Sequence, residues 1–247
     1  HELLSIAMNC LRVPGHPARS FWEALQSYWF VHLVLQIESN GHSISLGRFD
    51  QYLYPFYQKD RESGILTREQ ALELLECFWI KCCEINKIRE WAFTQFMSGY
   101  PMFQTLTLGG IDAEGQNAVN DLSHLCLEAT ARMKTIQPTT VVRISNKTPD
   151  SFLMAASKAL LEHGGGLPAF FNDEVAVPML ANIGVSLEDA RDWSIMGCSE
   201  PQVAGKFLPA TGGTCHVNLL KILELVLNGG INPSTKRRIL PQNGNLL

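Results

Sequence analysis

The sequence lacks the features that mark several large classes of protein. No apolar stretch approaches the roughly 18 residues of a membrane span, and no signal peptide is visible. No run of lysine or arginine is present, and the net charge of −4 argues against a nucleic-acid or membrane-surface binder. We therefore expect a cytoplasmic protein with neither nucleic acid nor membrane as partner.

The cysteines also lack the spacing of a disulfide framework. There are seven, an odd number, and they are scattered along the chain. This pattern fits a reducing compartment. Four fall in segments with helical patterning, where a cysteine usually serves as a small buried apolar residue: Cys77, Cys82, Cys83 and Cys126.

The ends of the chain carry no usual start or stop. The sequence begins at His1 without a methionine, directly in a helical pattern, and ends at Leu247 after a loop-like stretch. With 247 residues and 46% hydrophobic content it is long enough for one large core. We expect a single truncated domain over residues 1–247, cut from a larger protein.

Apolar periodicity and turn residues predict alternating helices and strands. Helices are expected over 20–38, 67–86, 115–135, 148–163, 174–182 and 215–229, and strands over 100–112, 139–145, 167–173 and 193–197, with a loop at 201–213. This order predicts an α/β fold with a parallel or mixed sheet and long outer helices. In such folds sites gather after the carboxyl ends of strands. The segments after Leu108, at Asn172–Asp173 and at Cys198 qualify.

A short polar segment follows the first long helix. It begins at Gly41, is broken again at Gly47, and carries His42, Ser43, Arg48 and Asp50. Such a loop beside a buried helix suits a binding site. The alternative is a polar turn with a surface pair between Arg48 and Asp50. His32, within the helix, is expected to be a hydrogen-bonded core residue.

A thiol and a carboxylate lie two residues apart at Cys198 and Glu200, before Pro201. In an extended segment, side chains at i and i+2 point to the same side. Pro201 stiffens the segment because its ring fixes φ and restricts the preceding residue. Cys198 and Glu200 are therefore expected to face one space.

Four interpretations of this pair compete. A metal site would need Cys215 and His216, whose spacing from Cys198 is unusual for zinc. A nucleophilic cysteine is poorly served by a nearby carboxylate, which raises the thiol pKa. In a purely structural role, Cys198 would be buried and Glu200 would either cap the backbone or pair with Lys206. In the fourth, sulfur carries a neutral hydrogen atom and Glu200 acts separately as a general base.

The residues around the pair resemble a known family. The segment 196–202, Met-Gly-Cys-Ser-Glu-Pro-Gln, is similar to the active-site segment of the glycyl radical enzymes, the pyruvate formate-lyase-like family. The dehydratase and lyase branch usually has Gly-Cys-Val-Glu-Pro, so Ser199 replaces a valine. Further blocks of the family resemble this chain in the same order: residues 41–57, 100–110, 167–173 and 185–191.

The resemblance implies a fold and a chemistry. The fold is part of a ten-stranded β/α barrel, with the cysteine on a loop that reaches into its centre. In this family a glycyl radical oxidises the cysteine to a thiyl radical, which takes a hydrogen atom from the substrate. Cys198 matches the thiyl site, and Glu200 matches the base that deprotonates a substrate hydroxyl. The chain is thus expected to belong to a lyase of dehydratase or decarboxylase type, acting on a small polar or aromatic molecule.

The resemblance also suggests pocket residues and alternatives. His42 and Ser43 match positions that hold polar substrate groups, Phe103 an aromatic pocket wall, and Thr211 a substrate contact in a loop that departs from the diol dehydratases. A formate C-acetyltransferase has two adjacent cysteines, so Ser199 disfavours that activity. A catalytically inactive homologue acting as a structural subunit is the other alternative.

The glycyl radical motif itself is absent from these residues. No Arg-Val-x-Gly-Tyr-type segment occurs. The resemblance therefore implies a radical outside this chain, installed by a radical S-adenosylmethionine activating enzyme with an iron–sulfur cluster, in a homodimer from an anaerobe. We expect the 247 residues alone to bind no metal and to be inactive.

Overall fold

The computed structural model describes residues 1–39, 41, 43–88, 90–96, 102–207 and 218–239. The chain divides into two compact units, residues 1–212 and 213–247. The second contains α11 (Leu219–Leu227), whose first turn is capped by Asn218. Among the described residues, no helix combines the length and the apolar character needed to cross a membrane.

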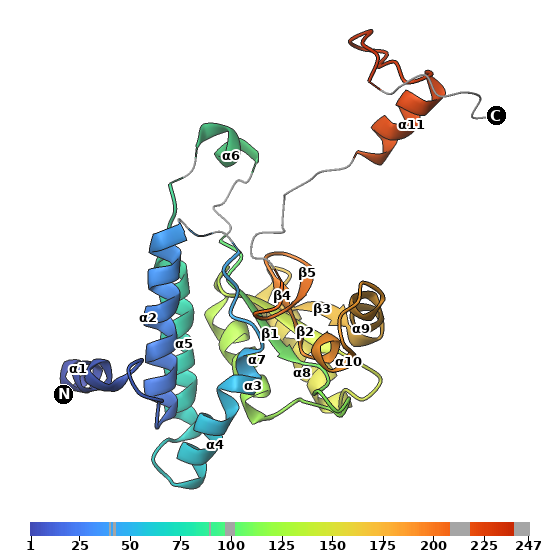
Figure 1. Cartoon of the computed structure of the whole chain (residues 1–247). Coiled ribbons are helices and arrows are strands. Elements are labelled where there is room, and N and C mark those ends of the chain that lie inside the picture. Colours follow the sequence, from blue (N-terminus) through green and yellow to red (C-terminus); the bar gives the residue numbers. More distant parts are fainter. Residues whose placement is uncertain (40, 42, 89, 97–101, 208–217, 240–247) are drawn as a thin grey trace. The chain divides into compact units, whose positions relative to one another are not determined.

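The first unit contains the helices and strands that the sequence predicts, in their order (Figure 1). Its elements are α1 (Glu2–Arg12), α2 (Phe21–Ser39), α3 (Phe49–Tyr52), α4 (Tyr54–Glu62), α5 (Arg68–Glu84), α6 (Trp91–Phe96), β1 (Thr105–Gly109), α7 (Asp121–Met133), β2 (Thr139–Ile144), α8 (Asp150–His163), β3 (Ala169–Asn172), α9 (Asp173–Asn182), α10 (Leu187–Arg191), β4 (Trp193–Met196) and β5 (Glu200–Val203). The sequence does not predict the short helices α3, α4 and α6 or the strand β5. The mixed helix and strand fold is confirmed.

Three parallel strands form the centre of this unit. The order is β1-β2-β3, with Thr107 opposite Val141 and Val142 opposite Phe170. Gly47 adds a parallel bridge to Leu106 on the outer edge of β1. The helices α7 and α8 connect these strands, as parallel neighbours require a crossover. The ten-stranded barrel stays a prediction.

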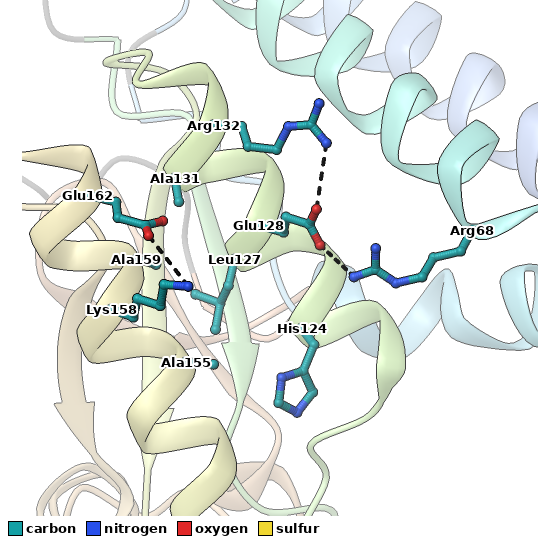
Figure 2. Close-up of a pocket in the computed structure, with 10 residues that line it drawn as sticks. All are labelled: Arg68, His124, Leu127, Glu128, Ala131, Arg132, Ala155, Lys158, Ala159 and Glu162. Carbon is teal, nitrogen blue, oxygen red and sulfur yellow. Dashed lines mark hydrogen bonds and ion pairs between the residues drawn. The ribbon is translucent and has the colours of Figure 1, made fainter.

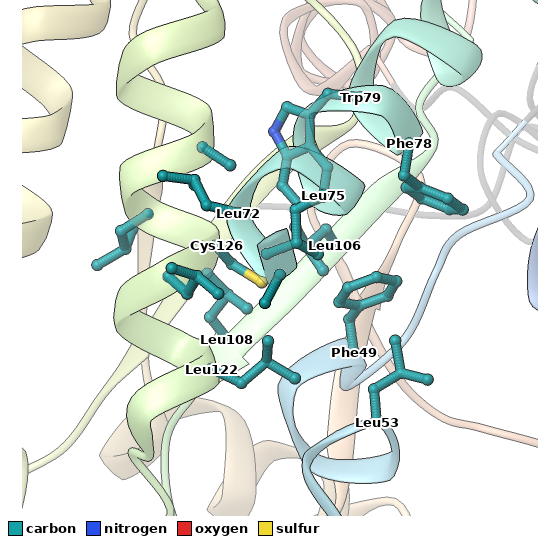
Figure 3. Packing of buried hydrophobic residues seen from close by; sticks show 14 of the residues in the cluster. Phe49, Leu53, Leu72, Leu75, Phe78, Trp79, Leu106, Leu108, Leu122 and Cys126 are labelled. Carbon is teal, nitrogen blue, oxygen red and sulfur yellow. The ribbon is translucent and has the colours of Figure 1, made fainter. Parts of the chain in front are cut away.

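The two faces of β1 have different partners because successive side chains point to opposite sides. Leu106 and Leu108 are fully buried against α7 and α5 (Figure 3). Burial of one leucine contributes roughly 1.5–3 kcal/mol. Thr105 and Thr107 point the other way, toward β4. The leucines therefore hold the sheet to the helices and leave two hydroxyls for the opposite face.

That opposite face is covered by an antiparallel hairpin of β4 and β5, which pairs Met196 with Glu200. Trp193, Ile195 and Val203 form a second core there, packed with Val141 and α9. The prediction of a loop at 201–213 is wrong for β5. Pro201 suggested a loop, but β5 pairs only with β4 in the described sheet, and an edge strand tolerates a missing N–H.

Local signals fix the helix starts. Thr67 accepts from the backbone of Gln70, whose side chain accepts from the Thr67 N–H, so a capping box begins α5. Pro149 occupies the N-cap of α8 and not the first helical position, because its ψ of 138° is still extended. The helix therefore begins one residue later than its proline suggested.

The predictions of burial are confirmed for His32 and only in part for the cysteines. His32 is 2% exposed and lies 2.8 Å from the amide oxygen of Gln104, which confirms a hydrogen-bonded core histidine. Cys82 and Cys126 are buried as predicted. Cys77 is exposed and Cys83 half-buried, so burial was wrong for Cys77, which lies on the outward face of α5.

Candidate active site

The thiol of Cys198 lies at the tip of the β4–β5 hairpin. Residues 197–199 form the turn, and Gly197 has a φ of +65°, a conformation that glycine adopts without a Cβ penalty. Cys198 and Ser199 are exposed, while Glu200 is half-buried at the start of β5. The predicted stiff turn is thus a tight hairpin, and Cys198 is its tip.

Two oxygens meet beside Gly197. A Cβ built on this glycine would lie 2.9 Å from Ser43 Oγ and 3.0 Å from Glu200 Oε2. The same Glu200 oxygen accepts a hydrogen bond from the Ser199 N–H at 2.9 Å. Only glycine at position 197 leaves room for both side chains. The structure therefore brings Ser43 and Glu200 together next to Cys198.

Although Cys198 is exposed, its surroundings partly desolvate the sulfur; this partial desolvation, and then the negative charge of Glu200, raise the pKa of the Cys198 thiol above its ordinary value. At neutral pH the sulfur therefore keeps its proton. A nucleophilic cysteine needs the opposite shift. A protonated thiol beside a carboxylate suits a group that gives and takes a neutral hydrogen atom.

Two backbone contacts with β1 and one with Ser45 fix the hairpin. The Gly197 N–H donates to Ser45 Oγ at 2.9 Å, and Thr105 Oγ1 donates to the Gly197 carbonyl oxygen. Further back, the Ile195 N–H donates to Thr107 Oγ1 at 3.0 Å. The hairpin tip therefore sits at the amino end of β1.

The base of the hairpin is held by a buried ion pair. Arg143 is completely buried and contacts Asp173 Oδ1 at 2.8 Å. It also donates to the carbonyl oxygens of Trp193 at 2.7 Å and Arg191 at 2.8 Å. Burial and the charge of Arg48 lower the pKa of Arg143 to about 10, so it remains charged at neutral pH.

Cys198 does not lie at the edge of the parallel sheet where the other two predicted site segments lie. The contacts of Trp193 with Arg143 and of Gly197 with Thr105 show that β4 runs antiparallel to β1. Cys198 therefore lies at the amino end of β1, while the loop after Leu108 and the Asn172–Asp173 end lie at the opposite edge. The rule for loops after parallel strands does not apply because the thiol is carried by a hairpin of reversed direction.

The predicted pocket residues fall into two groups. Ser43 and Phe103 both have positive φ, 64° and 52°, and lie before β1, where the Ser43 N–H donates to the Met102 carbonyl oxygen at 3.0 Å. The structure thus places Ser43 and Phe103 at the same edge as Cys198. His42 and Thr211 lie outside the described residues, and their roles stay predictions.

Two surface pairings suggested by the sequence are wrong. Arg48 pairs with Asp192 at 2.9 Å, while Asp50 is buried and accepts from the Gly109 N–H at 2.7 Å. Lys206 pairs with Asp189 at 2.6 Å and not with Glu200.

The described residues contain no group of three or more His, Cys, Asp or Glu side chains that could hold a metal ion. Cys215 and His216 lie outside them.

Sequence reasoning missed Ser45 and Thr105, the two hydroxyls that contact the Gly197 peptide. The signal was present in the alternation Thr-Leu-Thr-Leu at 105–108, which places both threonines on one face of the strand. What the sequence could not indicate was that a glycine peptide would occupy that face.

A separate hollow of about 400 Å³ lies between α5, α7 and α8, on the helix side of the sheet (Figure 2). Its charges are paired: Arg68 with Glu128 at 2.5 Å and Lys158 with Glu162 at 3.6 Å. Its floor is formed by alanines, including Ala131 and Ala159. It shares no residue with the hairpin site.

The chain belongs to the pyruvate formate lyase-like family, whose model matches residues 1–247. The trans-4-hydroxy-L-proline dehydratase of Clostridioides difficile is 40% identical over 98% of this chain and 31% of its own length. The B12-independent glycerol dehydratase of Clostridium butyricum matches with 45% identity and a TM-score of 0.86, over 99% of this chain and 30% of that one. A glycyl radical enzyme from Archaeoglobus fulgidus matches with 38% identity and a TM-score of 0.87, over 94% of this chain and 30% of that one.

These relatives are glycyl radical dehydratases and lyases, enzymes that use a glycyl radical, and the resemblance seen in the sequence is confirmed. The chain spans about 30% of the length of the relatives it matches.

Proposed function

We propose that this chain supplies the thiol and the base of a glycyl radical lyase of dehydratase or decarboxylase type, acting on a small polar or aromatic molecule. The observation that carries the proposal is the hairpin tip, where a protonated thiol, a carboxylate and the Ser43 hydroxyl surround a side-chain-free glycine. The dehydratase and lyase relatives support the same reaction class.

In this proposal Cys198 removes a hydrogen atom from the substrate, and Glu200 removes a proton. A glycyl radical elsewhere in the complete enzyme supplies the one-electron oxidation. Cys198 gives up its S–H hydrogen atom, and its sulfur then takes one from a substrate carbon, so that one C–H bond breaks and one S–H bond forms. Glu200 accepts the proton of the hydroxyl on that carbon. In a dehydratase the hydroxyl on the next carbon leaves as water, completed by the proton that Glu200 holds, and the S–H of Cys198 returns its hydrogen atom to the product radical.

The three parallel strands would form part of the barrel wall, with His42, Ser43, Phe103 and Thr211 around the substrate. A radical S-adenosylmethionine activating enzyme with an iron–sulfur cluster would be the activating partner. A homodimer in the cytoplasm of an anaerobe is the expected state.

Replacement of Glu200 by glutamine in the complete, activated enzyme tests the base. The amide keeps the size of the side chain but cannot accept the hydroxyl proton, and general-base catalysis is typically worth about 10²–10⁴-fold. We expect turnover to fall by that factor. We also expect the unchanged enzyme to need no coenzyme A. Glu162→Gln, on the outer face of α8, is the matched control and should be fully active. A fully active Glu200→Gln enzyme would remove the base assignment, and dependence on coenzyme A would favour an acetyltransferase.

A further inference from the structure

Two hydroxyls from different segments hold the one peptide that determines where the thiol points. Ser45 Oγ accepts from the Gly197 N–H at 2.9 Å, and Thr105 Oγ1 donates to the Gly197 carbonyl oxygen. Both polar groups of Gly197 are thereby engaged, and Cys198 is the next residue. Rotation of the tip about this peptide would break both hydrogen bonds at once.

Ser45 also connects the thiol to the pocket segment. Its hydroxyl lies 3.3 Å from the Ser43 carbonyl oxygen and 3.5 Å from the Phe103 carbonyl oxygen, toward which it donates. Ser43 and Phe103 both have positive φ, a backbone conformation that needs support from its surroundings. One hydroxyl therefore joins the hairpin tip to the two segments that carry the expected substrate contacts.

Thr105 is fixed more firmly than Ser45. It is fully buried in β1, and its carbonyl oxygen accepts from the Leu46 N–H at 2.6 Å. Its backbone pairs with Thr139 of β2 in the parallel ladder. The Gly197 carbonyl oxygen is thus bonded to a buried residue of the parallel ladder, and Ser45 adds the link to the pocket.

We propose that Ser45 and Thr105 are positioning residues that set the direction of the Cys198 thiol relative to the bound substrate. This inference rests on the proposed role of Cys198 as the hydrogen-atom carrier. Hydrogen-atom transfer requires sulfur and carbon at close range, so a displaced tip slows the chemical step while the binding groups stay in place. A misplacement of about 1 Å can cost on the order of 100-fold in rate.

The test uses the complete, activated enzyme with three variants. Ser45→Ala and Thr105→Val each remove one hydrogen bond to Gly197, and Ser45→Thr retains the hydroxyl. The matched control is Thr140→Val on β2: Thr140 is equally buried, and its hydroxyl lies 2.9 Å from that of Thr130, away from the hairpin. Turnover is normalised to the glycyl radical signal measured by electron paramagnetic resonance.

For Ser45→Ala and Thr105→Val we expect kcat to fall by roughly tenfold or more. The KM should change by less than about threefold for Thr105→Val, whereas Ser45→Ala should also raise KM, because its hydroxyl contacts the Ser43 and Phe103 carbonyl oxygens of the pocket segments. The isotope effect for substrate deuterated at the reacting carbon should rise, and Ser45→Thr should recover most of the rate. Thr140→Val should match the unchanged enzyme. The inference would be overturned if Ser45→Ala and Thr105→Val both kept the kcat of the unchanged enzyme, or if Thr140→Val lost as much kcat as they do. Turnover by Cys198→Ser would instead overturn the proposed function itself.

Discussion

Gly197→Ala should lower both the free energy of unfolding and the turnover of the complete enzyme. The substitution places a methyl group in a backbone with φ +65°, which costs roughly 1–2 kcal/mol for a non-glycine residue. It also brings that methyl to 2.9 Å from Ser43 Oγ and 3.0 Å from Glu200 Oε2, where ordinary contacts begin at 3.4 Å. Each oxygen must therefore move by about half an ångström, and both belong to the proposed pocket.

Gly205→Ala is the matched control. Gly205 follows the same hairpin with a φ of +73°, and a Cβ there would meet nothing within 4 Å. The two variants should lose a similar free energy of unfolding, about 1–2 kcal/mol in urea titrations. Only Gly197→Ala should lose turnover, by roughly tenfold or more, because only its methyl displaces Ser43 and Glu200. Equal activity of the two variants would refute the reasoning about the tip.

Three further predictions concern single groups. The pKa of Cys198, measured from about pH 6 to 10 by iodoacetamide alkylation and peptide mass spectrometry, should lie above that of an ordinary thiol. Glu200→Gln should lower this pKa because a neighbouring negative charge is removed. An unchanged alkylation profile in Glu200→Gln would contradict the electrostatic coupling. Arg143→Met should destabilise the protein by about 3–5 kcal/mol in urea because Asp173 loses its buried partner, whereas Arg68→Met, in an exposed pair, should cost at most about 1 kcal/mol. Thr67→Ala should cost about 1 kcal/mol by loss of the α5 cap, and no change in the urea midpoint would count against the capping box.

The helices and parallel strands could be predicted because their signals are local. The capping box at Thr67 and the β-branched run at 139–144 each specify their own element. The strand β5 could not be predicted in this way, since Pro201 is tolerated there only because the strand lies at an edge. The direction of β4 also depends on contacts with Arg143 and Thr105, far away in the sequence.

The residues of the candidate site could be predicted in part, and its construction less so. The spacing of Cys198 and Glu200 predicted that they face one space, and the charge of Glu200 acts on the Cys198 thiol. Ser43 lies beside the same glycine, while its role toward a substrate stays a prediction. The roles of Ser45 and Thr105 depend on the folded position of the Gly197 peptide, which no local pattern encodes.

The central claim is that Cys198 carries the hydrogen atom. Its most direct test is turnover by Cys198→Ser in the complete, activated enzyme, with the glycyl radical quantified in the same sample by electron paramagnetic resonance. The neighbouring Ser199→Ala is the control, because the bond from residue 199 to Glu200 uses the backbone N–H. We predict a full radical signal with no product for Cys198→Ser, and normal turnover for Ser199→Ala. Product formation by the Cys198→Ser enzyme would contradict the account.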